Sequence, residues 1–397
     1  MQATAERIEV RADEYLKGVA AIVDEVRAAA PETEANRRLS PRIVQLMMEA
    51  GVFNVAVPQA WGGLELDPIT HARGIELLTT ADASAGWCAM IGCDTGYAAS
   101  HLPGEAGREL FTDLSAATVF VLNPTGTAVP TDGGYNVNGR WSFASGSTHA
   151  KIFCLGTLQM TATGPEMLPS GSPAIRVIAV AREQAEVIDT WTTTGLRGSA
   201  SNDVGLTNVF VPAERTFSFF LDRSPRAEPL YQLPGLFVMK MGAIPLGIAR
   251  GAIDDVLAIA ATKRALGNMN AIQESQWLQL AIARAEWKYR QAREFYYNAL
   301  HDLWDTLARG ERVTQAQAVA VHLSIVGAME NCTEVVDAMY RAGGSAALYA
   351  RHTLDRRLRD IHTAAQHTVF APDRVADDGK VLLGLPALNS PIISVPE

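Results

Sequence analysis

Apolar residues recur with a helical period along the first third of the chain. Between residues 3 and 30 they form a stripe, three or four positions apart, among Glu, Arg and Lys. Ser40 and Pro41 are typical of a helix start, because serine caps the first N–H groups and proline suits the first helical position. We expect this helix to reach Met48, and further helices over 68–80 and 82–97.

From about residue 117 the pattern becomes that of β-strands. Five runs rich in β-branched and aromatic residues are separated by turn sequences such as 131–134, Thr-Asp-Gly-Gly. The predicted strands cover residues 118–122, 135–141, 151–157, 174–180 and 204–211. Together they predict a compact antiparallel β-domain of ordinary domain size.

Helical patterning returns after Pro234 and gives four long segments. These cover 236–266, 271–307, 314–342 and 346–369, whereas the tail, 371–397, contains prolines and has no period. Four facing apolar stripes are typical of a helix bundle. We therefore predict an α+β chain with an N-terminal helical domain (1–116), a central antiparallel β-domain (117–232) and a C-terminal four-helix bundle with tail (233–397).

Composition and charge exclude several classes of function. A net charge of −9 and a pI near 5.5, without a basic run, argue against nucleic-acid binding. We find no signal peptide and no apolar stretch long enough to cross a bilayer, so we expect a cytoplasmic protein without a membrane anchor. The four cysteines form no C-x-x-C pair and the eight histidines lack ligand spacing, so no metal site is predicted.

The stretch from Gly139 to Gly146 is the strongest candidate for a ligand site. As a strand it would place Trp141, Phe143 and Ser145 on one face, followed by a glycine that allows close approach of a flat ligand. Taken alone, the same residues also describe an ordinary strand with a buried aromatic face and a turn.

Several motifs, in their order along the chain, resemble the acyl-CoA dehydrogenase fold family. The Gly-Leu-Arg-Gly-Ser run at 195–199 leads to Asn-Val-Phe-Val-Pro at 208–212, similar to that family's central signature. Gly343-Gly344 followed by Arg359-Asp360 is similar to its C-terminal pattern. Lys263, Arg264 and Gly267 before Gln273 resemble its motif for the dinucleotide half of FAD. The resemblance spans most of the chain.

Two chemistries share this fold, and the residues present favour one of them. The dehydrogenases need a carboxylate base, and the two positions where the family places it align here with Thr368 and Ala249. A hydroxyl or a methyl group cannot serve as a base near neutral pH. The chain instead resembles the flavin monooxygenase branch, the oxygenase components of two-component hydroxylases.

Three matches carry the resemblance to that branch. They are the Asp82–Trp87 segment, the W-x-x-x-S-G run from Trp141 to Gly146, and His367 beyond Arg359-Asp360. One departure stands against them, because several members carry another active-site histidine where this chain has Cys93, Asp94 and Thr95.

The resemblance implies a mechanism and two catalytic residues. Reduced flavin would react with O2 to give a C4a-hydroperoxide, which would hydroxylate a small aromatic or heteroaromatic substrate. The resemblance favours FADH2 over FMNH2 as this flavin. Ser145 would donate a hydrogen bond near flavin N5 or the peroxide. His367 would take a proton from the substrate or supply one to the departing oxygen.

The resemblance also implies the cofactor contacts and the partners. We expect the flavin to contact Asn123, Thr125, Thr127, Trp141, Ser145, Gly146, Arg264, Gln273, Gly343 and Gly344. Because part of this set comes from a neighbouring subunit in the fold, a homotetramer is implied. No G-x-G-x-x-G follows a strand, so reduced flavin would arrive from a separate NAD(P)H:flavin reductase.

Two alternatives remain open at this point. One is an acyl-CoA dehydrogenase or oxidase with an unrecognised base. The other is a non-catalytic binding subunit of the same fold. Substrate identity, the choice between FAD and FMN, and the choice between C-, N- and S-hydroxylation do not follow from the sequence.

Overall fold

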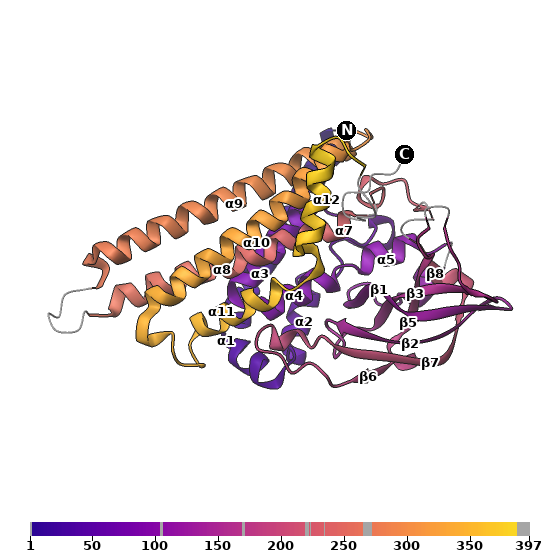
Figure 1. Cartoon of the computed structure of the whole chain (residues 1–397), viewed down its shortest axis with the longest axis horizontal. Helices are drawn as coiled ribbons and strands as arrows, with labels where there is room; N and C mark the ends of the chain where they lie inside the picture. The colour runs from indigo at the N-terminus through magenta and orange to yellow at the C-terminus, as the bar shows by residue number, and fades with distance from the viewer. Residues whose placement is uncertain are drawn as a thin grey trace.

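A computed structural model describes residues 2–103, 106–168, 171–218, 222, 224–233, 235–264 and 272–386. Helices come first, then strands, then helices again, and this predicted order is confirmed (Figure 1). The first group comprises α1 (Gln2–Asn36), α2 (Pro41–Glu49), α3 (Pro68–Ala81), α4 (Ala83–Gly92), α5 (Thr95–His101) and α6 (Ala106–Leu110).

Side-chain caps fix where several of these helices begin. The Ser40 hydroxyl accepts from Ile43 N at 3.4 Å, and the Asp82 carboxylate accepts from Ser84 N at 2.6 Å. The single helix expected over 82–97 is two helices, α4 and α5, which corrects that prediction. The chain turns at Cys93 and Asp94, whose ψ angles of −3° and −6° depart from the helical value.

One sheet forms the second part of the molecule. Its strands are β1 (Thr118–Thr131), β2 (Gly134–Ala144), β3 (Ile152–Thr161), β4 (Gly164–Pro165), β5 (Ile175–Ala181), β6 (Glu186–Ile188), β7 (Asn202–Pro212) and β8 (Thr216–Phe217). Their order is β6-β7-β2-β1-β3-β5-β8, with β4 paired to β3.

The sheet is mixed, so the prediction of a wholly antiparallel domain was wrong. β1 pairs with β3 in parallel, from Thr118 opposite Ile152, whereas the other strand pairs are antiparallel. The reason is the connection over 145–151. β2 runs back beside β1 and ends where β1 begins, so a short crossing of that end lets β3 start on the other side of β1 and run in the same direction.

The third part is the helix bundle. It comprises α7 (Leu236–Met239), α8 (Ala243–Thr262), α9 (Gln276–Ala308), α10 (Gln315–Gly343), α11 (Thr353–Ala364) and α12 (Pro372–Leu382). Short 3-10 turns are η1 (Gln59–Trp61), η2 (Arg182–Gln184), η3 (Arg197–Ser199), η4 (Ala213–Arg215), η5 (Pro229–Tyr231), η6 (Lys240–Gly242), η7 (Ile272–Glu274), η8 (Gly344–Ala346) and η9 (Thr368–Phe370).

Two predictions for this region need correction. The fourth segment, expected over 346–369, is helical only from Thr353 to Ala364, because η8 and a turn precede it and η9 follows it. The tail expected to lack structure contains α12, which starts at Pro372. Residues 265–271 and 387–397 of the predicted segments lie outside the described part of the chain.

Two helices of the bundle reach the length and apolar content of a membrane span, contrary to our expectation from the sequence. They are Leu236–Thr262 and Gln315–Ala346, with hydropathies of 1.4 and 1.2. Their most apolar windows are 83% and 61% buried inside the molecule, as expected for core helices. They are therefore weak evidence of a membrane protein.

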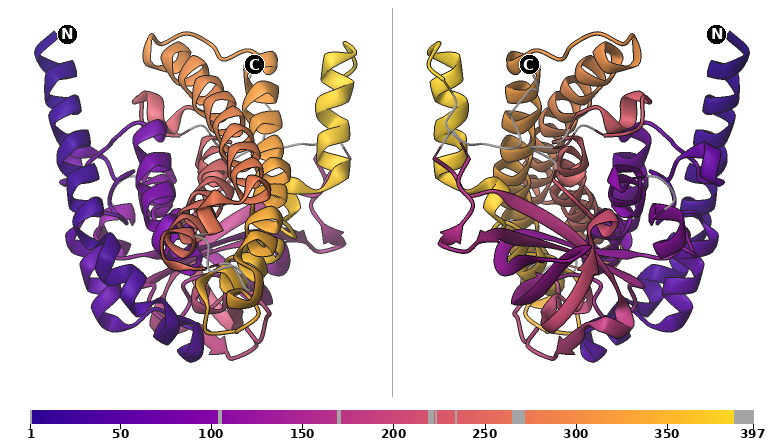
Figure 2. Two further views of the ribbon diagram at one scale, coloured as in Figure 1. Left: turned by 90° about the vertical axis from the view of Figure 1, so that its left-hand side faces the viewer. Right: turned by 90° about the vertical axis from the view of Figure 1, so that its right-hand side faces the viewer.

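Helices and sheet meet at the centre of the molecule. The bundle helices α9 and α10 extend away from the sheet, and Figure 2 shows α1 on one flank and α12 on the other. One continuous apolar core runs through all three parts, and a smaller one lies among α5, α6, β1, β3 and β5. Helix α4 and the crossover over 145–151 lie at this junction, where the candidate site is found.

Candidate active site

Ser145 lies at the start of the crossover from β2 to β3, buried against α4. Its hydroxyl accepts a hydrogen bond from Trp87 Nε1 at 3.0 Å and is 2.7 Å from the hydroxyl of Ser201. Ser201 in turn lies 2.7 Å from the hydroxyl of Ser199. Because the indole N–H can only donate, Ser145 accepts from it and keeps its own proton for another acceptor.

His367 also contacts Trp87. The two ring centroids are 5.8 Å apart in an edge-to-face arrangement, and Phe370 contacts the histidine ring at 6.4 Å. His367 precedes η9 as its N-cap, and its Nδ1 accepts from Val369 N at 3.3 Å. Burial lowers the pKa of His367 to about 4, so the ring is neutral near pH 7. One indole thus joins the two residues that the sequence singled out as catalytic.

The loop that carries Ser199 and Ser201 is held by α4 and α11. Leu196 N donates to Asp360 Oδ1 at 2.6 Å, and Gly198 N donates to the Ser84 hydroxyl at 3.1 Å. Leu196 and Ala200 both have positive φ, an uncommon backbone conformation that needs such support. Burial and the nearby Asp82 carboxylate raise the pKa of Asp360 to about 7. The Arg-Gly-Ser and Arg-Asp motifs are therefore in contact.

The sheet is irregular beside Ser145. The β1–β3 register shifts between Val121 and Gly126, and the β2–β7 register shifts between Trp141 and Ala144. These breaks interrupt the backbone ladder next to the crossover, where a flat ligand could find unpaired peptide groups.

The predicted contacts in β1 lie at the first of these irregularities. Asn123 and Thr125 are exposed and Thr127 is half-buried. The Thr125 hydroxyl donates to Arg140 O at 2.8 Å and that of Thr127 to Asn138 O at 3.4 Å, so both hydroxyls already serve the sheet. Their contact with flavin stays a prediction.

Trp141 and Phe143 do not share a face, contrary to our expectation. Trp141 is fully buried, donates from Nε1 to Gly156 O at 2.6 Å, and packs where side chains on Gly126 or Gly139 would clash. Phe143 has a φ of +65°, which breaks the strand alternation, and is 70% exposed. Its ring makes an edge contact with Trp191 at 6.3 Å.

Gly146 and His149 complete the turn after Ser145. Gly146 has a φ of +78°, and an added Cβ would lie 3.2 Å from His149 Nε2, so glycine is required here. Both ring nitrogens of His149 are buried without a hydrogen-bond partner within the described residues. A buried N–H that lacks a partner costs about 1–3 kcal/mol, which makes His149 a residue that a bound polar ring or water would satisfy.

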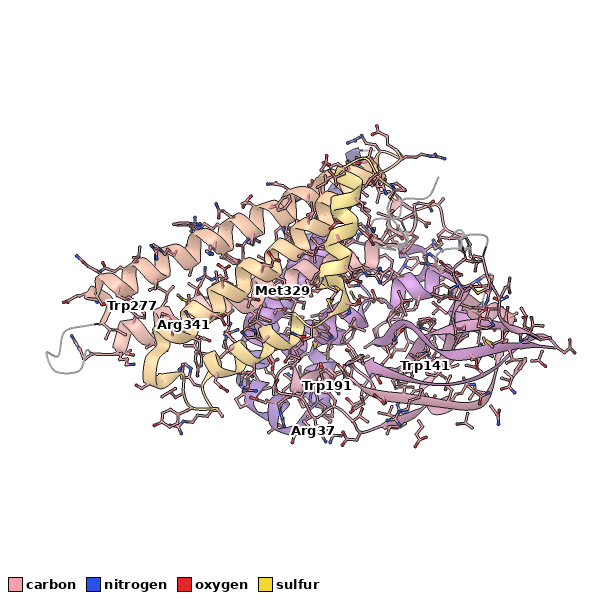
Figure 3. All side chains as sticks on the ribbon, viewed as in Figure 1. Arg37, Trp141, Trp191, Trp277, Met329 and Arg341 are labelled. Carbon is pink, nitrogen blue, oxygen red and sulfur yellow. The ribbon has the colours of Figure 1, made fainter. Side chains whose placement is uncertain are left out.

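A second group of predicted cofactor residues lies at the far end of the bundle. Arg264, Gln273, Gly343 and Gly344 come from the ends of α8 and α10 and from η7, and Lys263 Nζ donates to Gly343 O at 3.3 Å. In Figure 3 the nearby Trp277 and Arg341 are far from Trp141 in the sheet. The structure therefore does not bring the two predicted groups together within one chain. Gly267 lies outside the described residues.

The region that replaces the family's other histidine contains a buried ion pair. Asp94 forms a hydrogen-bonded pair with Lys240 of η6, and both side chains are almost fully buried. The Lys240 ammonium lies 5.5 Å from the ring centroid of Tyr97, whose hydroxyl has no partner within the described part. Sequence reasoning missed Lys240.

Two cavities among the described residues lie outside this site. A volume of about 740 Å³ opens among α1, α3, α8 and α9, where Glu76 accepts from Tyr289, Tyr297 and Arg293. A second, of about 360 Å³, is lined by α10, Ala365 and Phe370, next to the segment that bears His367. We assign the candidate site from the hydrogen bonds and burial around Ser145 rather than from cavity volume, because the larger cavity contains neither Ser145 nor His367.

Comparison with known proteins identifies the class. Residues 12–107 and 239–372 match the models of the N-terminal and C-terminal domains of acyl-CoA dehydrogenase. Indole-3-acetate monooxygenase of Pseudomonas putida is 29% identical over 92% of this chain and 92% of its own length. The HsaA oxygenase subunit of Rhodococcus jostii, a flavin-dependent monooxygenase, is 27% identical over 89% of this chain and 94% of its own length.

Solved structures agree with this result. The 3-HSA hydroxylase from Rhodococcus sp. RHA1 superposes with a TM-score of 0.86 at 25% identity, covering 96% of this chain and 98% of its own. XiaF from Streptomyces sp., solved with FADH2 and glycerol, has the same fold. Its TM-score is 0.88 at 24% identity, covering 98% of this chain and 100% of its own.

The fold and the named relatives identify a flavin-dependent monooxygenase built on a dehydrogenase scaffold. The chain belongs to the acyl-CoA dehydrogenase family, and its curated relatives are flavin-dependent monooxygenases and hydroxylases.

Proposed function

We propose that this chain is the oxygenase component of a two-component monooxygenase that uses reduced flavin and O2 to hydroxylate a small aromatic or heteroaromatic compound. The observation that carries the proposal is the contact of Trp87 with both Ser145 and His367. The two positions of a dehydrogenase base, Ala249 and Thr368, supply no carboxylate. The relatives named for indole-3-acetate and for resorcinol support an aromatic substrate.

The residues present fit a flavin ring. The hydroxyl of Ser145 has a proton to donate, and His149, whose ring nitrogens have no partner within the described residues, lies four residues further on. Flavin rings offer both acceptor and donor atoms along one edge, so these groups could bind and orient the ring. Bound reduced flavin supplies the electrons that activate O2. The burial of Ser145, Trp87 and Ser201 excludes water from that side.

We propose FAD rather than FMN, bound across a subunit interface in a homotetramer. Arg264, Gln273, Gly343 and Gly344 come from the ends of α8 and α10 and from η7. In Figure 3, Trp277 and Arg341 of this end of the bundle are far from Trp141 of the sheet, so we assign these four residues to a flavin whose ring is held by another copy. A guanidinium can bind the phosphates of FAD, and a glycine turn lets the backbone approach its adenosine. FMN has one phosphate and no adenosine. An exposed apolar stripe on α9 supports association with further copies.

The proposal is tested with the purified chain, a flavin reductase, NADH and air. Phenols, resorcinol and indole-3-acetate serve as probe substrates, and products are identified by mass. We expect hydroxylated product and tighter binding of FADH2 than of FMNH2. Bleaching of bound flavin by an acyl-CoA without oxygen, with no hydroxylation of any aromatic probe, would instead establish a dehydrogenase. Failure to bind flavin in either redox state would indicate a non-catalytic subunit.

A further inference from the structure

The hydrogen bond to the ring of His367 determines which nitrogen carries the proton. Val369 N–H donates to Nδ1 at 3.3 Å, so Nδ1 must present a lone pair. A neutral imidazole has one N–H, which therefore lies on Nε2. We infer that His367 presents an N–H to the reactants and acts as a hydrogen-bond donor, not as the base that removes a substrate proton.

The surroundings of His367 keep the ring neutral. Its ring contacts are the aromatic side chains of Trp87 and Phe370, and no ion pair involves it within the described residues. Burial lowers its pKa to about 4, because a charged ring would lose solvation without gaining a partner. A neutral Nε2–H gives up its proton only to form an imidazolate, so the group holds its proton and no proton leaves His367.

A second histidine keeps Val369 in place. His322 Nε2 is 3.0 Å from Val369 O, which can only accept, so that nitrogen carries a proton. On its other side His322 Nδ1 is 2.6 Å from Asp378 Oδ2 of α12, and both side chains are fully buried. Asp378 and His322 are therefore positioning residues, because they hold the segment whose N–H orients His367.

This inference rests on the proposed function for its consequence but not for its geometry. An N–H fixed beside Trp87, whose indole donates to Ser145, can stabilise negative charge that develops on an oxygen atom during hydroxylation. A substrate proton must then leave by another acceptor, such as water. Nothing in this role requires His367 to change its protonation state.

The first test measures the proton directly, in flavin-free protein labelled with ¹⁵N-histidine at pH 7. The signal of His367 is assigned by its loss in His367→Gln. We expect chemical shifts of a protonated Nε2 and an unprotonated Nδ1, unchanged between pH 5.5 and 8. A proton on Nδ1, or titration within that range, overturns the inference whether or not the protein hydroxylates anything.

The second test separates a donor from a base with a matched pair of variants. His367→Gln can donate a hydrogen bond but cannot act as a base, whereas His367→Glu is a carboxylate that can accept a proton. Both lose the same cap of η9, and thermal unfolding checks that both fold. We expect Gln to keep hydroxylation within about tenfold of the wild type and Glu to fall about 100-fold, the usual scale for a misplaced catalytic group.

Equal or higher activity of the Glu variant overturns the inference. His362→Gln is the control, because His362 is half-exposed and pairs with Asp337 away from Trp87. It should match the wild type. If the wild type itself hydroxylates no probe, the proposed function fails, and the ¹⁵N measurement still decides the state of His367.

Discussion

Trp87 is the residue on which the geometry of the site depends most. Its N–H donates to Ser145 while its ring edge contacts His367, so one side chain sets the spacing between them. The sequence pointed to Ser145 and His367 through motifs, and included Trp87 only as part of a resembling segment. A hydrogen bond between residues 58 positions apart leaves no local pattern. The position of Ser201 beside Ser145 could therefore not be predicted, and Ser199 entered only as the last residue of a resembling motif.

Replacing Trp87 with phenylalanine removes the N–H and keeps most of the ring. A lost hydrogen bond of this kind costs about 1 kcal/mol, so we expect reduced flavin to bind about fivefold more weakly. We also expect a larger share of oxygen to be released as hydrogen peroxide, measured by peroxidase assay against NADH consumed. Ser142→Ala, on the exposed side of β2, is the control. Unchanged affinity and coupling in Trp87→Phe would show that the bond to Ser145 has no role.

Asp360 gives the folded protein a pH dependence with an uncommon sign. Burial raises its pKa to about 7 from an ordinary 3.8, so the folded state binds its proton more tightly than the unfolded state. The protonated Asp360 therefore adds to the free energy of unfolding below about pH 4, and this gain is lost as the pH rises to about 7. Asp360→Asn still offers an acceptor to Leu196 N but cannot ionise. The melting temperature of the variant minus that of the wild type should therefore be higher at pH 8 than at pH 4.5.

Thermal unfolding at several pH values measures this difference. Asp82, Arg356 and Arg359 act on the same carboxyl group and stay in place in the variant. Asp24→Asn is the control, because Asp24 is exposed and pairs with Arg27, which stays charged over this pH range, so its difference from the wild type should be constant. A difference for Asp360→Asn that is independent of pH would contradict the raised pKa.

Among the elements, α12 is the one whose role the sequence concealed. Its apolar residues are few, and its buried contact is the hydrogen bond between Asp378 and His322 rather than an apolar stripe. The parallel pairing of β1 with β3 was hidden for another reason. Strand patterns report which residues are buried, and the direction of a neighbour depends on how the chain crosses between strands. Helix starts at Ser40 and Asp82 were predictable, because caps are local.

His322→Leu should release α12 from the bundle. Removing one partner of a buried pair costs about 3–5 kcal/mol, because the other is left without compensation. We expect this loss in the free energy of unfolding by urea, with faster hydrogen exchange in α12 and a fall in coupling at unchanged flavin affinity. Lys380→Ala removes the pair with Asp377, in which the lysine reaches solvent, and should cost less than about 1 kcal/mol. Similar losses in the two variants would mean that the pair does not hold α12.

At the scale of the whole molecule, α9 presents an apolar stripe to solvent. Trp277, Leu280, Trp287 and Phe295 are each about half exposed and recur on one side of the helix. Large apolar groups in such a row are typical of an interface between subunits. The order of the three parts was predictable from periodicity, whereas this association depends on a surface that the sequence does not mark as exposed.

Trp287→Glu should therefore split the oligomer. We expect the wild type to sediment as a tetramer in analytical ultracentrifugation and the variant as smaller species, because a charge in an apolar interface is costly. If Arg264 and Gly344 serve a neighbouring subunit, FAD affinity should fall with the loss of assembly, while FMN affinity changes little. Glu183→Gln, an exposed carboxylate of η2 in the β-domain, is the control. A monomeric wild type that binds FAD tightly would contradict the tetramer.

The short crossing from β2 to β3 has a consequence for how this protein can vary. The same residues, 145–151, determine the strand order of the sheet and carry Ser145, Gly146 and His149. A single inserted residue would displace the hydroxyl from Trp87 and shift the start of β3 against β1. The length of this connection is therefore fixed by both demands at once, whereas the β1–β2 hairpin at Asp132 and Gly133 has room for insertions. New substrate preferences must arise through loops elsewhere around the site.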